Sequence, residues 1–234
     1  SKEETLRKEA EDLLRRLEEL TRRLEKKARE LLERAKKLSR DLAEELKRLL
    51  KELREKGVPE ELIKVLEEVA KTSIDLNKEV IDVIRRVIEE SLELNKRVLD
   101  VLRRVLDIAA RKGRDKKAIR DVVREAARVI KEVIDEDEKV NRDLKRVIER
   151  VIDDDRKALE RLRKAVEEVA SRGDDEARDH MVLHEYVNAA GITRKNKRIL
   201  EELLKAIETL SDENKKILTE ILDALRRLVE KIEK

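Results

Sequence analysis

The residues best suited to hold a metal ion are two histidines and a glutamate spaced by single helical turns. His180 and His184 stand four positions apart, and Glu176 lies four positions before His180. Imidazole and carboxylate groups at this spacing share one helical face and can bind a divalent cation. A di-metal helical bundle, however, needs Glu-x-x-His motifs on two helices, and the chain contains no other histidine. We therefore predict no metal site and no cofactor.

Three consecutive aspartates are the other group with acid–base potential. Asp153, Asp154 and Asp155 follow one another, but no histidine or cysteine accompanies them as a nucleophile or its base. We interpret Asp155 as pointing into the core and its two neighbours as solvated. The sequence therefore predicts a protein that is not an enzyme.

The composition is extreme, because half of the 234 residues are charged and Phe, Trp and Cys are absent. Leu, Ile, Val and Ala nevertheless recur at helical spacing, so the chain has an apolar stripe to bury and is expected to fold. Its 60 Lys and Arg are interleaved with 57 Asp and Glu, so the chain has no strong positive electrostatic field that would attract nucleic acid. No apolar run could span a bilayer or act as a secretory leader. We expect a soluble, unsecreted protein without a natural location, which would stay in the cytoplasm when expressed recombinantly.

Glycine and proline divide the chain into four pieces of similar length. KGVPE around Gly57 and Pro59, RKGRD around Gly113 and SRGDD around Gly173 each combine a helix-ending glycine with a residue suited to begin the next helix. The predicted helices lie near 2–56, 59–111, 115–171 and 175–233, and connections this short force antiparallel neighbours. The predicted fold is all-α, a monomeric antiparallel four-helix bundle with short loops that spans residues 1–234 as one domain.

An internal repeat of 18 residues predicts the shape of this bundle. SIDLNKEVIDVIRRVIEE from Ser73 is followed by SLELNKRVLDVLRRVLDI from Ser91, and NKRIL from Asn196 recurs as NKKIL from Asn214. Eighteen residues make five turns of an unperturbed helix, whereas a heptad imposes a supercoil. We therefore expect an elongated, nearly straight bundle.

Polar residues at the same spacing interrupt the apolar stripes and predict two polar layers. The antiparallel register predicts the pairs Thr21 with Asn214, Ser39 with Asn196, Ser73 with Asp155 and Ser91 with Asp137, with Asn77 and Asn95 one turn away. Our hypothesis is that the layers are buried hydrogen-bond networks, because a slipped partner would leave polar groups unsatisfied at about 1–3 kcal/mol each. The alternative is that these residues are solvated at the edges of the stripes.

Residues 178–193, RDHMVLHEYVNAAGIT, carry a strand-like pattern inside the last predicted helix. Apolar and β-branched residues alternate there with polar ones, and the segment holds the only Tyr, the only Met and both His of the chain. Over all sixteen positions it resembles the eleventh strand of green fluorescent protein, in the polar-substituted form used as a split-reporter tag. The resemblance assigns both histidines to the tag, which argues further against a purposeful metal site.

The remainder of the chain resembles de novo designed helical bundles with built-in hydrogen-bond networks. Idealised helices, glycine-marked loops and repeated polar layers are typical of the cage-and-latch switches known as LOCKR. This resemblance is architectural and implies a latch helix that hides a functional peptide.

Segment 178–193 would present different residues as a helix and as a strand. Alignment with the 18-residue repeat predicts a core-facing, caging set in the helical form: Met181, Val182, Tyr186, Ala189 and Ile192. In the strand form, the resemblance implies that the barrel interior is faced by Met181, Leu183, Glu185 and Val187. Glu185 aligns with Leu203, and Gly191 inside a helix costs about 1 kcal/mol relative to Ala. We therefore expect this segment to be the weakest part of the bundle.

The two forms also differ in length, and this predicts a function. Sixteen residues span about 24 Å as a helix and roughly 50 Å as a strand, so complementation requires the segment to leave the bundle. We expect a switch that cages the strand and releases it to the ten-strand fragment of the fluorescent protein. A key peptide resembling 194–233 could compete for its groove. The alternative is a passive designed scaffold that displays an uncaged tag. A lipid-binding bundle is disfavoured because its usual aromatic residues are missing.

Overall fold

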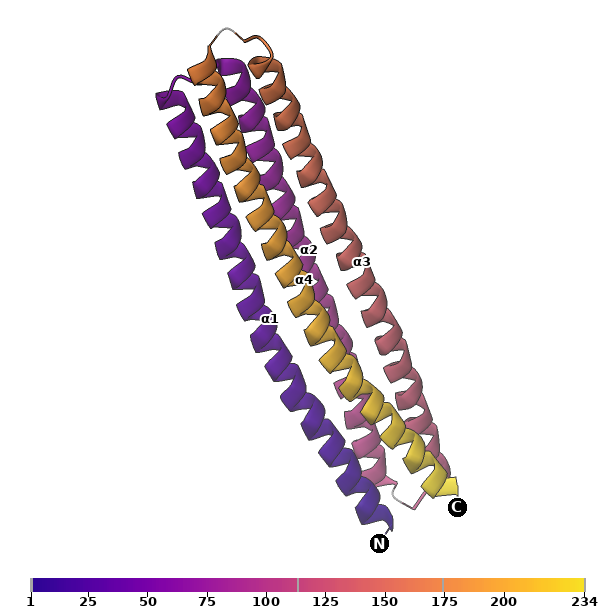
Figure 1. The fold of residues 1–234 in the computed structure, drawn as a ribbon. Helices are drawn as coiled ribbons and strands as arrows, with labels where there is room; N and C mark the ends of the chain where they lie inside the picture. Colours follow the sequence, from indigo (N-terminus) through magenta and orange to yellow (C-terminus); the bar gives the residue numbers. More distant parts are fainter. Residues whose placement is uncertain (1, 113, 174, 234) are drawn as a thin grey trace. The chain divides into compact units, whose positions relative to one another are not determined.

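The computed structural model describes residues 2–112, 114–173 and 175–233, and nearly all of them are helical (Figure 1). The four helices are α1 (Lys2–Glu55), α2 (Glu60–Arg111), α3 (Lys116–Ala170) and α4 (Glu176–Glu233). No strand occurs in these three described ranges. The predicted all-α, four-helix fold class is confirmed, and each predicted helix boundary lies within one residue of the observed one.

The turn between α1 and α2 forms as its glycine and proline predict. Gly57 has a φ of +74°, a backbone conformation that residues with a side chain rarely adopt. The N–H of Val58 donates a hydrogen bond of 3.2 Å to the carbonyl of Leu53. The carbonyl of Pro59 then accepts the N–H of Leu62 at 3.0 Å, at the beginning of α2. The glycine therefore ends one helix and the proline begins the next.

Aspartate side chains cap the next two helices. The Asp115 Oδ1 accepts the backbone N–H of Ala118 at 3.1 Å, and the Asp175 Oδ1 accepts that of Arg178 at the same distance. Gly173, which precedes α4, has a φ of +62°. Gly113, the remaining predicted turn glycine, lies outside the described residues.

Contacts divide the chain into two compact units, and each unit contains part of all four helices. Unit 1 consists of Ser1–Glu30, Arg85–Asp143 and Ala206–Lys234. Its core includes a fully buried residue from each helix, namely Leu17, Val98, Ile130 and Leu218. Ion pairs at its surface, such as Arg16 with Glu220 at 2.6 Å, join different helices.

Unit 2 consists of Leu31–Ile84 and Leu144–Lys205. Its ion pairs join Arg34 to Glu202 and Glu45 to Lys195, so residue numbers rise along α1 while they fall along α4. The two helices are therefore antiparallel within this unit, as the short loops predict. The strand-like segment 178–193 belongs to unit 2.

Candidate partner-binding segment and its helical groove

The strand-like segment 178–193 is helical and lies close to the beginning of α4. Its local sequence favours a strand. Apolar residues of α1, α2 and α3 in unit 2, however, form a groove into which the segment packs. Helix packing thus overrides local β-propensity, which is a weak determinant beside burial. The hydrogen bond that the Asp175 carboxylate accepts from the Arg178 N–H supports the first turn.

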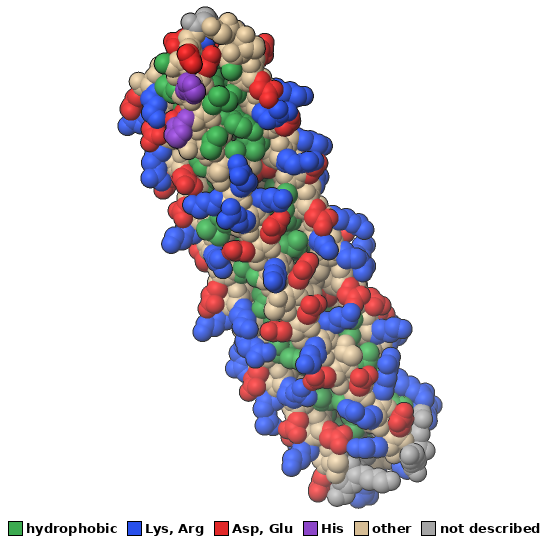
Figure 2. Space-filling model, viewed as in Figure 1, with side chains coloured by type: hydrophobic (Ala, Val, Ile, Leu, Met, Phe, Trp, Pro, Cys, Tyr) green, Lys and Arg blue, Asp and Glu red, His purple; other side chains and the backbone are tan. Residues whose placement is uncertain are grey.

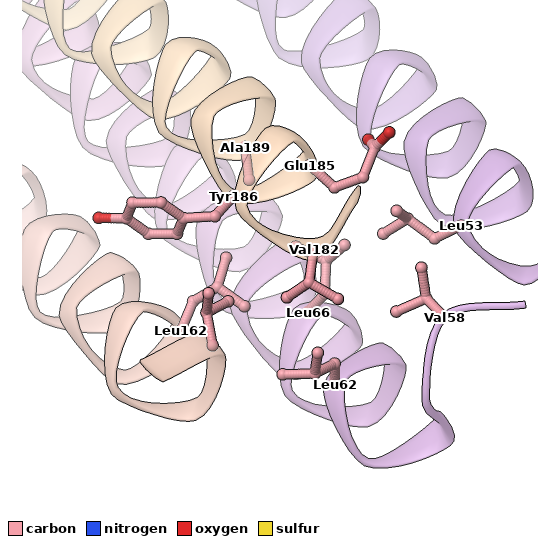
Figure 3. A pocket seen from close by; sticks show the side chains of 10 residues that line it. Leu53, Val58, Leu62, Leu66, Leu162, Val182, Glu185, Tyr186 and Ala189 are labelled. Atoms are coloured by element: carbon pink, nitrogen blue, oxygen red, sulfur yellow. The ribbon is translucent and has the colours of Figure 1, made fainter. Parts of the chain in front are cut away.

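The inner face of the segment packs into this groove (Figure 3). Val182 is 3% exposed and Ala189 is 4% exposed, and both belong to the same buried cluster as Leu53 and Leu162. The remaining predicted caging residues, Met181, Tyr186 and Ile192, are half-buried and pack against that cluster. All five predicted caging residues therefore contact the core of unit 2.

Ala190 is a buried residue that the repeat alignment missed. It is 3% exposed, whereas Glu208, its equivalent 18 positions later, is exposed. The repeat carried no signal for its burial, because the two residues differ in environment as well as in type.

Glu185 lies on the inner face as well, and its carboxylate is paired. The side chain is 5% exposed, and its Oε1 accepts a hydrogen bond from the Lys56 Nζ at 2.8 Å. The Asn188 Nδ2 donates to the other carboxylate oxygen at 3.3 Å. The hydrogen bond and the charge of Glu185 raise the pKa of Lys56 above its usual range. Lys56 was not predicted, although the antiparallel register places the end of α1 beside the beginning of α4.

A small cavity of about 20 Å³ remains beneath the segment. Four residues of α4 line it, Val182, Glu185, Tyr186 and Ala189, together with apolar residues of the other helices. In Figure 3 the side chains of Glu185 and Tyr186 extend to opposite sides of α4, which leaves the smaller Val182 and Ala189 between them. Such a volume holds about one water molecule. The groove is therefore filled except for this cavity.

The outer face of the segment carries exposed apolar residues and both histidines. Leu183 is 46% exposed and Val187 is 59% exposed, which is unusual for large hydrophobic residues. His180 and His184 are exposed on the same side (Figure 2). Of the four residues predicted to face the barrel interior, the helix thus buries Glu185, half-buries Met181 and leaves Leu183 and Val187 in solvent.

In unit 2, four of the predicted layer residues form one hydrogen-bonded group. The Ser73 hydroxyl donates to the Asp155 carboxylate. Asn77 and Asn196 exchange two amide hydrogen bonds of 2.9 and 3.0 Å, and the Asn196 Nδ2 also donates to the Asp155 Oδ2 at 3.2 Å. All four residues are buried.

Unit 1 contains the corresponding group. The Ser91 hydroxyl donates to the Asp137 Oδ1 at 2.7 Å, and Asn95 and Asn214 exchange hydrogen bonds of 2.9 and 3.2 Å. Two further residues were not predicted: the Asn141 Nδ2 donates to the Ser211 Oγ at 2.7 Å. Ser211 lies one turn before Asn214, so its position on the same helical face was the available signal.

The asparagines predicted to face Thr21 and Ser39 form their amide hydrogen bonds with other asparagines. Asn214 bonds Asn95 instead of Thr21, and Asn196 bonds Asn77 instead of Ser39. Two amides can each donate and accept, so each Asn–Asn pair forms two reciprocal hydrogen bonds. The Thr21 hydroxyl is buried without a hydrogen-bond partner among the described residues. Ser39 lines a cavity of about 10 Å³ beside Asn77 and Asn196.

The buried aspartates have altered acidity. Burial raises the pKa of Asp155 above its usual range, while the hydrogen bonds from Ser73 and Asn196 oppose that change. Burial raises the pKa of Asp137 in the same way. Asp153 is only half-buried and pairs with Arg156 at 2.7 Å, which lowers its pKa. Asp155 and Asp153 therefore occupy different environments.

Among the described residues, no three His, Cys, Asp or Glu side chains gather closely enough to enclose a metal ion. Within the same part of the chain, no helix combines the length and apolar character required to cross a membrane.

Comparisons with known proteins add little to this geometry. No protein-family model matches the chain, and no curated protein matches it. One solved structure, described as a computationally designed three-helix bundle, is 18% identical over 97% of this chain and 95% of its own, with a TM-score of 0.29. A likeness of this strength carries no argument about fold or function.

Proposed function

We propose that the chain is a de novo designed, non-enzymatic switch that holds a split fluorescent-protein strand in a helical, caged form. The closed state buries part of segment 178–193, and the open state offers it to the ten-strand fragment. The fragment binds the open state alone, so its apparent affinity falls tenfold for about every 1.4 kcal/mol by which the closed state is favoured. The regular helices, the 18-residue repeat and the two hydrogen-bonded groups support a designed origin.

The observation that carries this proposal is the burial of Glu185. This carboxylate would point into the barrel in the strand form, yet in the helical form it lies 5% exposed against Lys56. Val182 and Ala189 are buried on the same face. One side chain cannot occupy both environments, so binding of the fragment and packing in the groove exclude each other.

The rival function is passive display of an uncaged tag on a scaffold. The exposed Leu183 and Val187 favour it, because half of the predicted barrel-facing set is already accessible to solvent. The segment also lies at the N-terminal end of α4, and helix ends fray most readily. Under this alternative, the groove contacts would add no barrier to complementation.

The rate of fluorescence recovery with the ten-strand fragment separates the two functions. The whole chain is compared with a synthetic peptide of residues 178–193 at equal concentration. We expect the whole chain to react at least tenfold more slowly, and the ratio of the two rates measures the open fraction. Equal rates would establish the display function instead.

A peptide of residues 194–233 extends the proposal to a trigger. This peptide has the sequence of the part of α4 that follows segment 178–193, so it could compete for the surface on which α4 packs. We expect it to raise the recovery rate of the whole chain and to leave the rate of the free 178–193 peptide unchanged. A scrambled peptide of the same composition is the control, and an equal effect of both would contradict competition.

A further inference from the structure

Although the sequence predicts no purposeful metal site, we infer that His180 and His184 can together bind a divalent transition-metal ion, and that this site exists only while segment 178–193 is helical. Both side chains are exposed on the outer face of α4, away from the groove (Figure 2). They are separated by one helical turn, which places their Cβ atoms about 6 Å apart. Two imidazoles at that distance can coordinate one ion together.

The chemistry of the pair selects the ion. Neutral imidazole is a ligand of Zn²⁺, Cu²⁺ and Ni²⁺, and two such ligands leave the remaining coordination positions to water. Glu176 is exposed one turn before His180, so its carboxylate and the His180 imidazole form a second, weaker pair of ligands for the ion. The groove contacts on the inner face are not disturbed, because neither histidine belongs to the buried cluster.

Strand formation destroys the site. Four residues of a strand cover about 13 Å, so the two histidines would share a face but could not bind the same ion. An ion that binds one conformation alone stabilises it according to the ratio of free ion to its dissociation constant. The ion would therefore hold the segment in its helical form. This consequence for complementation rests on the proposed function, whereas the binding site does not.

The first experiment measures the site itself with Zn²⁺ by calorimetry and by hydrogen exchange of the amides of residues 178–193. We expect one ion per chain and slower exchange in its presence. His180→Gln and His184→Gln should each weaken binding at least tenfold, while Glu201→Gln, an exposed residue of the same helix, should leave it unchanged. Unaltered zinc affinity in both histidine variants would overturn the inference.

The second experiment measures fluorescence recovery with the ten-strand fragment at increasing Zn²⁺. At a free concentration tenfold above the dissociation constant, we expect recovery to slow about tenfold, with reversal by a chelator. The His184→Gln chain and the free 178–193 peptide should show no such slowing. Binding without any slowing would refute the switch but not the metal site, whereas absent binding would refute the metal site and leave the switch intact.

Discussion

The Lys56 ammonium lies 2.8 Å from the Glu185 carboxylate, so a lysine at the end of α1 pairs with the one buried acid of segment 178–193. Lys56 itself remains 46% exposed, while Glu185 is 5% exposed. The pair therefore compensates a carboxylate that the groove would otherwise hold without a counter-charge. Lys56 lies outside the segment, so it can be changed without altering the strand that the fragment would bind.

Lys56→Met should open the cage. The substitution leaves the Glu185 carboxylate buried without its cation, which is unfavourable in the closed state and has no effect in the open state. We expect faster fluorescence recovery than in the parent chain. Lys51→Met, at an exposed position of the same helix, is the control and should have no effect. An unchanged rate in Lys56→Met would show that the ion pair does not hold the segment closed.

Val182→Ala and Leu183→Ala should act on opposite states of the switch. Val182 is buried in the helix but would lie outside the barrel, so its truncation should weaken caging by about 2 kcal/mol and raise the recovery rate roughly 30-fold. Leu183 is exposed in the helix but would face the barrel interior, so its truncation should slow recovery. Synthetic peptides with the same substitutions measure the effect on the strand alone. A slower rate in both whole-chain variants would contradict caging by Val182.

Asp155→Asn should change how stability depends on pH. Burial raises the pKa of Asp155 in the folded state, so the folded chain binds more protons than the unfolded chain. The contribution of this residue to the free energy of unfolding is therefore greatest below its unfolded pKa of about 3.9. It declines as the pH rises through the folded value. The difference in unfolding free energy between variant and parent, measured in guanidinium chloride from pH 3 to 8, should change over this interval. A constant difference would show that Asp155 does not titrate differently on folding.

Asn95→Leu and Asn214→Leu should be far from additive. Each single substitution leaves the other buried amide without its reciprocal partner, which should destabilise the fold by about 1–3 kcal/mol. The double substitution removes both amides and should cost less than the sum of the two. Chemical unfolding of the parent, both single variants and the double variant measures the coupling. Strict additivity would mean that the two amides do not interact.

Thr21→Val should stabilise the chain by about 1 kcal/mol, because it removes a buried hydroxyl that has no partner among the described residues. Val matches Thr in shape and keeps its β-branch. The midpoint of chemical unfolding should move to higher denaturant. Destabilisation of similar size would show that the hydroxyl bonds a group after all, such as the carbonyl one turn earlier.

Segment 178–193 shows how far sequence patterns predict burial. Alignment with the 18-residue repeat correctly placed Val182 and Ala189 in the core, since the same helical phase governs both repeats. It also placed Glu185 at a core position, where the structure buries it. It failed for Ala190, which is buried although Glu208, its equivalent in the repeat, is exposed.

The sequence by itself determined the four helices, their ends and the face that each turns inward, because these follow from periodicity and from glycine, proline and aspartate at the turns. The antiparallel register also placed Ser73 beside Asp155 and Ser91 beside Asp137, and both pairs are hydrogen-bonded. Only the tertiary structure decided the partners of the asparagines and of Glu185. Asn196 bonds Asn77, and Glu185 bonds Lys56, although more than one hundred residues separate the members of each pair. Those contacts depend on the rotation and axial offset of whole helices. A helical period fixes neither quantity, since it repeats identically at every turn.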